Sequence, residues 1–356
     1  MMSGSDDRSA AIEREITAFR FRSLHPALRF GTASDRYAGW IGQIYPEALD
    51  DQVTTRRKRL GRVSFEERLV PVSSAKHYFE HFSVLELDFT YYRPLRDADG
   101  SPTSSLNSIR QYLEFVPDDA LFILKVPRLF FSRRLRTTSG GKPVYVDNTD
   151  YLSADAYLRM FHEPAAEVLG SRLCGLVFEQ EYQRKSDTPE VDRYIEELDQ
   201  FFAQLPRDAQ THIEIRSEHL LQPAYFDWLE TCGIGFVFSH WTWLPPLRKQ
   251  WELCGARFTA ANGEAIARLM TPLRVSYEKA YAQTTPFDKT NSDIASSNQA
   301  RRMVDDTAAL AFRAIDSGKT LNIVANNRAW GNAPELSAAI ADRIVTEMRR
   351  RAQERP

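Results

Sequence analysis

Short apolar segments that end in a polar or turn-forming residue recur along the chain and predict buried strands. In the run from Leu121 to Arg128, an apolar stretch ends at Lys125 and is followed by Pro127, which cannot donate to a sheet ladder. Eight such segments lie near residues 29–32, 84–88, 121–125, 175–178, 212–216, 236–239, 273–276 and 321–326. Segments with helical periodicity separate most of them, including those around residues 106–113, 156–168, 191–202 and 310–315. This alternation predicts an α/β fold with parallel strands.

The choice between an open doubly wound sheet and a closed barrel depends on the first strand. No glycine-rich dinucleotide-binding pattern follows Phe30-Gly31-Thr32-Ala33, which favours a TIM-type (β/α)8 barrel with loop insertions. Such a barrel typically needs roughly 250 residues, so about a hundred of the residues here belong to insertions and tails. We expect an N-terminal extension over residues 1–28 and a single barrel domain over residues 29–350.

Three polar segments are predicted to be loop insertions, near residues 50–71, 137–148 and 283–297. The first contains the basic run Arg56-Arg57-Lys58-Arg59, which is more often a solvated charge cluster than a phosphate contact. An amphipathic helix is expected from about Pro334, and its final turn carries Arg349, Arg350 and Arg351, where positive charge is favourable.

Composition and charge narrow the protein class but not the partner. The chain has 356 residues, a formal net charge of −2 and a pI near 6.4, which gives no overall electrostatic signature of nucleic-acid binding. Cys174, Cys232 and Cys254 are far apart and predict neither a disulfide framework nor a thiolate metal site. No stretch approaches eighteen apolar residues and no signal peptide is recognisable, so we expect a cytoplasmic protein that does not span a membrane.

Several motifs, in this order and spacing, resemble the YecE-like family, catalogued as domain of unknown function 72. They are Phe30-Gly31-Thr32, Trp40, Tyr45-Pro46-Glu47, the segment from Leu85 to Arg93, the segment from Phe122 to Arg128, Glu214-Ile215-Arg216 and Asn326-Asn327. The resemblance extends from about Arg29 to Pro334. It implies a TIM-type barrel and a family without a settled biochemical activity.

Three elements depart from the family pattern. Asp88-Phe89-Thr90-Tyr91-Tyr92 stands where the family tends to have Asn-Ser-Thr-Phe-Tyr, and Gln180-Glu181-Tyr182-Gln183 replaces Gln-Leu-Pro-Pro. Arg274-Val275-Ser276-Tyr277 is aligned with the Arg-Leu-His-Gly end of the seventh strand, so a histidine is lost. These differences imply a divergent branch whose ligand differs or whose ancestral activity has lapsed.

Candidate proton-handling residues lie at the predicted strand ends, because loops at the C-terminal ends of barrel strands converge around one mouth. The candidates are Lys125, Glu86, Glu214 and His240. Glu86 and Asp88 are two residues apart, as are Glu214 and Arg216, so the members of each pair point to the same side of their strand. A desolvated lysine or a carboxyl group with a raised pKa would suit acid/base chemistry. The alternative is a structural ion-pair network inside the barrel.

Candidate ligand-binding residues share the same rim and include two arginines that are suited to a carboxylate or a phosphate. The set is Arg216, Arg274, Asn326, Asn327, Asp88, Tyr92, Gln180 and Trp241. Salt bridges, turn formation and simple packing are the structural alternatives for these residues. His77 and His81 are one helical turn apart, but they precede the second strand on the wrong side for a rim site, so no metal site is predicted.

The leading hypothesis is a protein that binds a small polar or anionic molecule at the rim and carries out acid/base chemistry without a cofactor. The second is nucleic-acid binding or phosphodiesterase activity by analogy with barrel endonucleases, which is less favoured because few metal-binding residues are in evidence. The third is a catalytically silent scaffold. The oligomeric state is left open.

Overall fold

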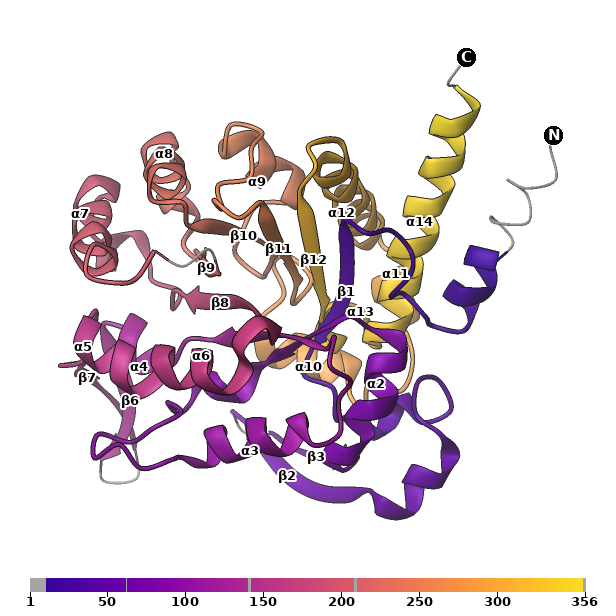
Figure 1. Ribbon diagram of the computed structural model, residues 1–356, viewed down its shortest axis with the longest axis horizontal. Coiled ribbons are helices and arrows are strands. Elements are labelled where there is room, and N and C mark those ends of the chain that lie inside the picture. The colour runs from indigo at the N-terminus through magenta and orange to yellow at the C-terminus, as the bar shows by residue number, and fades with distance from the viewer. Residues whose placement is uncertain (1–10, 62, 140–141, 208–209, 355–356) are drawn as a thin grey trace.

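Eight parallel strands close into a barrel, as Figure 1 shows, in a computed structural model that describes residues 11–61, 63–139, 142–207 and 210–354. Their order around the barrel is β1-β12-β11-β10-β9-β8-β5-β4, and β1 closes the ring by pairing with both β12 and β4. The strands are β1 (Leu28–Ala33), β4 (Val84–Leu87), β5 (Leu121–Lys125), β8 (Leu173–Glu179), β9 (Thr211–Glu214), β10 (Gly235–His240), β11 (Glu264–Leu269) and β12 (Thr320–Ala325). The predicted TIM-type barrel is confirmed.

Helices surround the barrel and bury the outward-facing side chains of its strands (Figure 1). Those described are α2 (Ala75–His81), α3 (Ser104–Leu113), α4 (Arg128–Phe131), α5 (Ala154–Tyr157), α6 (Glu163–Leu169), α7 (Val191–Phe202), α8 (Pro223–Cys232), α9 (Leu247–Leu253), α10 (Tyr277–Thr284), α11 (Ser292–Ala295), α12 (Asn298–Asp316), α13 (Asn327–Trp330) and α14 (Ala333–Gln353). Residues 11–17, within the predicted N-terminal extension, are also helical. The extension packs on the barrel through Phe21, whose ring stacks on Phe30 of β1 at 5.4 Å. No helix in the described ranges combines the length and apolar character needed to cross a bilayer.

The seventh strand is the one barrel strand whose predicted position is wrong. It was expected at residues 273–276, but β11 occupies Glu264–Leu269, and Ser276 instead caps the N-terminus of α10 through the backbone amide of Lys279. The error arises because β11 carries an arginine, Arg268, at a buried position, which interrupts its apolar run. The following loop buries Leu273 without being part of the sheet, so its apolar residues imitate a strand.

Two of the predicted loop insertions form antiparallel hairpins. Residues 50–71 contain β2 (Thr54–Leu60) and β3 (Val63–Leu69), and residues 137–148 contribute to β6 (Arg134–Ser139) and β7 (Lys142–Asp147). Pairing satisfies the backbone polar groups within each insertion, which a polar composition alone does not reveal. The third insertion, residues 283–297, begins with the last residues of α10 and then contains one short helix, α11, between irregular stretches.

The basic run on β2 is divided between the two faces of its hairpin. Arg56 and Lys58 each form an ion pair of 2.8 Å with Glu67 on β3, and the hydroxyl group of Tyr281 on α10 donates to the same carboxylate. Arg57, one position out of phase, is exposed. Part of the run therefore fastens the hairpin to α10.

The barrel interior consists of layers set by the two-residue alternation of the strands. Near the strand N-termini, Arg29 pairs with Glu264 at 2.7 Å, and the amide of Asn322 donates to that carboxylate at 3.0 Å. A separate apolar cluster fills the middle of the lumen and includes Val84, Ile123, Val177, Val237, Ile266 and Val324. Two residues further along several of these strands, the next inward-facing positions are charged. The C-terminal layer therefore contains the candidate site.

Candidate functional site

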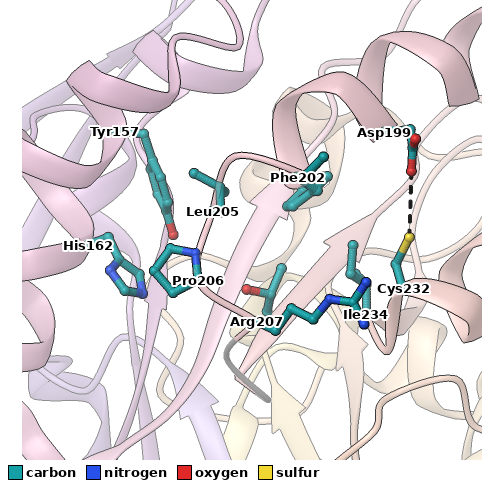
Figure 2. Close-up of a pocket in the computed structure, with 11 residues that line it drawn as sticks. Tyr157, His162, Asp199, Phe202, Leu205, Pro206, Arg207, Cys232 and Ile234 are labelled. Atoms are coloured by element: carbon teal, nitrogen blue, oxygen red, sulfur yellow. Dashed lines mark hydrogen bonds between the residues drawn. The ribbon is translucent and has the colours of Figure 1, made fainter.

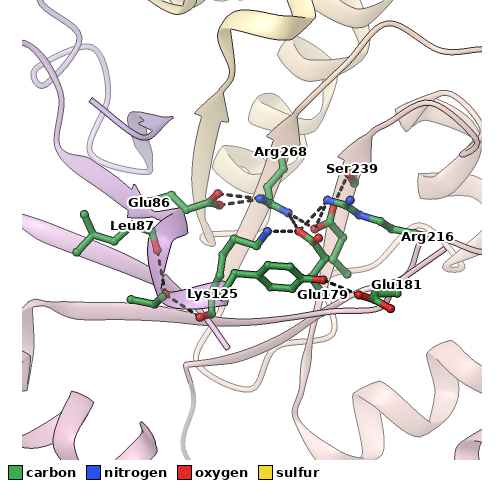
Figure 3. A network of polar contacts seen from close by, with 11 residues as sticks. Glu86, Leu87, Lys125, Glu179, Glu181, Arg216, Ser239 and Arg268 are labelled. Carbon is green, nitrogen blue, oxygen red and sulfur yellow. Dashed lines mark hydrogen bonds and ion pairs between the residues drawn. The ribbon is translucent and has the colours of Figure 1, made fainter. Parts of the chain in front are cut away.

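Arg268 on β11 lies at the centre of the charged layer and is fully buried (Figure 3). Its Nε and Nη2 atoms contact the two carboxylate oxygens of Glu86 on β4 at 2.8 and 2.7 Å, in a bidentate pair. Its Nη1 atom lies 3.1 Å from Glu179 on β8 and also contacts Glu214 on β9. One guanidinium group thus joins three carboxylates from three strands across the lumen.

Two further cations complete the layer from the side of the mouth. Lys125 Nζ lies 2.5 Å from Glu179 Oε2, and Arg216 Nη2 lies 2.7 Å from the same oxygen and 3.5 Å from Glu214. We call the six residues Glu86, Lys125, Glu179, Glu214, Arg216 and Arg268 the charge cluster. It balances three cations against three carboxylates in a region removed from solvent, as buried charges require.

Aromatic rings and hydrogen bonds fix the two outer cations. Lys125 Nζ lies 4.1 Å above the ring of Tyr91, and the Arg216 guanidinium lies 4.7 Å above the ring of Trp241. The hydroxyl group of Thr90 donates to the backbone carbonyl of Lys125 at 2.7 Å and holds the end of β5. Both cations are therefore oriented by loops of neighbouring strands, Lys125 by the loop after β4 and Arg216 by the loop after β10.

The protonation states within the cluster follow from competition between burial and charge. Burial acts to raise the pKa of Glu179, but Arg216, Lys125 and Arg268 together hold it well below its usual value. Burial raises the pKa of Glu86 above its ordinary 4.5, against the opposing charge of Arg268. Burial acts to lower the pKa values of Arg216 and Arg268, but the surrounding carboxylates outweigh it and raise both above the usual value for arginine. Glu179 is therefore an ionised counter-ion at neutral pH.

A cavity of about 160 Å³ lies against the charge cluster at the C-terminal mouth of the barrel. Its lining residues are Glu86, Asp88, Tyr91, Tyr92, Lys125, Glu179, Arg216, Trp241, Arg268, Met270, Thr271, Tyr277 and Arg328. Within the described part of the chain, neither Asp88 nor Arg328 forms an ion pair, although the Arg328 guanidinium lies 4.6 Å above the ring of Tyr277. The wall of the cavity therefore presents one cation and one carboxylate that have no ion-pair partner among the described residues.

Seven residues predicted from the sequence come together here. Glu86, Lys125, Glu214 and Arg216 belong to the charge cluster, and Asp88, Tyr92 and Trp241 line the cavity. Glu214 lies behind the cavity, where its carboxylate accepts from the hydroxyl group of Ser239. Glu214 and Arg216 have the expected common orientation, because their side chains lie 3.5 Å apart and both contact members of the charge cluster, Glu214 with Arg268 and Arg216 with Glu179.

His240, a predicted proton-handling residue, does not line the cavity. It is buried at the end of β10, and its Nδ1 atom lies 2.8 Å from the carbonyl oxygen of Thr271. Burial lowers the pKa of His240 to about 4, so the imidazole is neutral at physiological pH. Its neighbour Ser239, not His240, faces the charge cluster, because adjacent residues of a strand point to opposite sides.

Four predicted ligand-binding residues also lie outside the cavity lining, and three of them organise loops around it. Gln180 Oε1 accepts from the backbone amides of Arg216 and Ser217 at 3.1 and 3.3 Å, and so supports the loop that carries Arg216. Asn326 Oδ1 accepts from the amide of Arg328 at 3.0 Å and caps α13. Arg274 is exposed in a left-handed conformation with φ of 63°.

Asn327 is the remaining member of that group. Its Oδ1 atom accepts from Trp40 Nε1 at 3.3 Å and from the amide of Ala333 at 2.8 Å. These bonds tie α13 to the start of α14. Asn326 and Asn327 thus hold the helix that delivers Arg328 to the cavity.

The sequence interpretation missed Glu179, Arg268 and Arg328. Val177 lies in the apolar layer of the lumen, so the two-residue alternation along β8 would have placed Glu179 in the charged layer above it. The same alternation from Ile266 leads to Arg268, but the strand itself was misplaced. Arg328 follows Asn326-Asn327 on a short helix and had no recognisable signal.

A second cavity, of about 220 Å³, opens at the other end of the barrel between α7, α8 and the starts of β9 and β10 (Figure 2). It is lined by Tyr157, His162, Asp199, Phe202, Ala203, Leu205, Pro206, Arg207, Thr211, Cys232 and Ile234. Asp199 accepts from Trp228 Nε1 at 2.9 Å, and Cys232 Sγ lies 3.8 Å from it. This end of a TIM barrel is associated with stability more than with catalysis.

The histidines that were weighed as metal ligands have other partners. His77 Nδ1 lies 3.2 Å from Glu80, and His81 Nδ1 lies 3.1 Å from the carbonyl oxygen of Phe19. In the described residues, no three His, Cys, Asp or Glu side chains gather in a way that would hold a metal ion.

The family model described as "Protein of unknown function DUF72" matches residues 29–356. The chain belongs to this family. A DUF72 family protein from Enterococcus faecalis is similar, with 15% identity, a TM-score of 0.51 and coverage of 91% of this chain and 99% of that one. A DUF72 family protein from Thermotoga maritima has 16% identity, a TM-score of 0.49 and coverage of 90% and 99%. No protein of curated function is similar enough to count as a match.

The observed strand positions correct where the seventh strand ends. β11 ends at Arg268-Leu269, so Arg274-Val275 lies in the loop after the strand and not at its end. At 15% identity the likeness to the Enterococcus faecalis protein shows the shared fold alone.

Proposed function

We propose that the protein binds a compact anion-bearing molecule in the cavity at the C-terminal mouth of the barrel. The observation that carries the proposal is Arg328, a half-buried cation on the cavity wall that has no carboxylate partner among the described residues. The charges beneath it are already balanced within the charge cluster. A ligand anion would supply the missing partner through charge-assisted hydrogen bonds.

The size of the cavity limits the part of a ligand that fits inside it. A volume of about 160 Å³ is close to the roughly 150 Å³ of an engineered cavity that holds benzene, and it is below the 300–1,000 Å³ typical of drug-sized ligands. One carboxylate or phosphate group with a few attached atoms fills such a space. The rest of a larger molecule would lie at the open mouth.

Lys125 is the proton donor in this proposal. Its ammonium group lines the cavity, pairs with Glu179 and uses Tyr91 as an apolar support. Glu179 is held ionised by three cations and takes no proton at neutral pH, and Glu86 is occupied by its bidentate pair with Arg268. Acid catalysis by Lys125 at a group next to the bound anion would need no redox cofactor.

A silent scaffold is the second candidate, and the saturation of Arg268 by three carboxylates favours it. In that case the charge cluster only holds the strands together. The two candidates differ in whether Arg328 and Lys125 matter for anything besides folding.

The test is isothermal titration calorimetry with inorganic phosphate and with glycolate at low ionic strength. Loss of one charge-assisted contact costs about 1.5–3 kcal/mol, so Arg328→Gln and Lys125→Gln should each weaken binding at least tenfold. Arg343→Gln, which removes a surface ion pair with Asp305, is the matched control and should bind like the wild type. No binding of either anion to the wild type, or equal affinity in all three variants, would leave the scaffold as the better account.

A further inference from the structure

Three aromatic side chains form a partly exposed surface beside the cavity, which we call the aromatic shelf: Tyr182, Trp241 and Trp243. The ring of Tyr182 lies 6.0 Å from Trp241 and 6.1 Å from Trp243. Tyr182 is 47% exposed and Trp243 is 38% exposed, whereas Trp241 lines the cavity. The shelf therefore continues the cavity wall out to solvent.

The shelf is built by loops that follow neighbouring strands. Tyr182 belongs to the loop after β8, and the two tryptophans belong to the loop after β10. Arg216, from the loop after the intervening strand β9, lies over Trp241 and joins the shelf to the charge cluster. Exposed aromatic surface of this kind at a pocket mouth is typical of a ligand contact.

We propose that the ligand is a sugar ring that carries one acidic group, with the acid in the cavity and the ring on the aromatic shelf. This inference rests on the proposed function and names its ligand class. The cavity accommodates the acidic group, so a six-membered ring attached to it must lie outside, where Trp241 leads to the shelf. The apolar C–H face of the sugar would cover the exposed rings.

The geometry of the shelf favours a puckered ring over a flat base. The planes of Tyr182 and Trp241 are inclined by 46°, and those of Tyr182 and Trp243 by 37°. A planar nucleobase stacks on one face at a time and gains little from a surface of inclined rings. A sugar ring is thicker and presents C–H groups in several directions, so it contacts such a surface more fully.

The polar groups around the mouth also match hydroxyl groups, each of which both donates and accepts. Lys125 and Arg216 offer donors, whereas Asp88 on the cavity wall is an acceptor that forms no ion pair with any described residue. Glu181 is a further acceptor nearby, 3.4 Å from the hydroxyl group of Tyr91. This mixture of donors and acceptors beside aromatic rings suits a polyhydroxylated molecule better than an apolar acid.

The test compares ligands with and without each part. Inorganic phosphate, glycolate, glucose 6-phosphate, glucuronate, glucose and adenosine monophosphate are titrated into the wild type, Trp243→Ala, Trp243→Phe and Trp228→Phe. Trp228, half-buried on α8, is the control for the loss of a tryptophan elsewhere. Tyr182→Ala gives an independent change on the shelf.

We expect each sugar acid to bind at least tenfold more tightly than the bare anion with the same charged group. That ratio should fall to near one in Trp243→Ala and Tyr182→Ala, and it should be largely retained in Trp243→Phe and Trp228→Phe. The phosphate and carboxylate pairs show separately which acidic group is recognised.

Three outcomes would overturn the inference. One is equal binding of the sugar acid and its bare anion to the wild type, which leaves the proposed function standing. The second is a sugar advantage that survives both alanine variants. The third is tighter binding of adenosine monophosphate than of either sugar acid with the same dependence on Trp243. If neither phosphate nor glycolate nor any sugar acid binds, the proposed function itself fails.

Discussion

Replacing Arg268 with methionine tests whether the charge cluster is as desolvated as the structure indicates. Methionine keeps an unbranched, flexible side chain but is shorter and carries no charge. Glu179 retains Lys125 and Arg216, and Glu214 retains Ser239 and its longer contact with Arg216. Glu86 loses both of its ion-pair contacts and remains fully buried. The damage should therefore be concentrated on Glu86.

Removing one partner of a buried ion pair typically destabilises a protein by about 3–5 kcal/mol, because the other charge is left uncompensated. We expect a loss of that size at pH 8. The cost falls as the pH falls, because a protonated Glu86 carries no buried charge. Burial already raises the pKa of Glu86 above 4.5, and the variant raises it further, so the folded state binds the extra proton. The stability of the variant relative to the wild type should then decline as the pH rises above about 4.5.

Urea denaturation followed by tryptophan fluorescence measures both effects, since the chain has six tryptophans. Arg343→Met, which breaks a surface pair of 2.6 Å with Asp305, should cost less than about 1 kcal/mol. The double variant Arg268→Met/Glu86→Leu should regain most of the loss, with a coupling energy of about 2 kcal/mol or more. The charge cluster would not be desolvated if Arg268→Met proved as stable as Arg343→Met. The same conclusion would follow if the double variant regained none of the stability lost in Arg268→Met.

Three further predictions concern individual positions. Glu179→Gln removes a carboxylate whose pKa is held low. Such a group stabilises the fold above pH 4.5 and loses that effect on acidification. The free energy of unfolding of the variant should therefore vary less with pH below 4.5 than that of the wild type. His240 has a pKa of about 4 in the folded protein against 6.5 when unfolded, so NMR titration should show a neutral imidazole at pH 6. Acidification from pH 6.5 to 4 should lower the free energy of unfolding of the wild type by up to about 3 kcal/mol through this group, a loss that His240→Gln does not show. Gly31→Ala places a methyl group 2.1 Å from the carbonyl oxygen of Val84, whereas the new methyl group of Gly175→Ala meets only side-chain atoms at 3.1 Å or more. Thermal denaturation should therefore show a much larger loss of stability for Gly31→Ala than for Gly175→Ala.

Most of the barrel was predictable because its strands are buried on both faces and appear as apolar runs between amphipathic helices. β5 shows this clearly, because Leu121–Lys125 matches the predicted bounds. β11 was not found because its Arg268 is an inward-facing charge, acceptable only with three carboxylates from other strands around it. A partner more than fifty residues away leaves no trace in the local pattern of the strand that needs it.

The hairpins and the site show the same limit in different ways. The pairing of β2 with β3 depends on contacts such as those of Arg56 and Lys58 with Glu67, which a polar composition does not distinguish from a loop. The grouping of Glu86, Lys125 and Glu214 was predictable, because the ends of parallel strands meet at one rim. The direction in which the His240 side chain points was not predictable from the sequence. It became clear only from the structure, in which His240 Nδ1 contacts the carbonyl oxygen of Thr271.

The layered interior explains why the charge cluster alone cannot decide between structure and function. Arg268 is saturated and buried below the cavity, so any substitution there changes stability and the charge of the cavity floor together. The pKa of Glu179 is lowered and the pKa values of Arg216 and Arg268 are raised, which moves these three groups away from neutrality and fixes their charges. The charges of these three groups therefore stay the same while ligands exchange. Discrimination between ligands must then come from the groups above them, Arg328 and Asp88 at the wall and the aromatic shelf at the mouth.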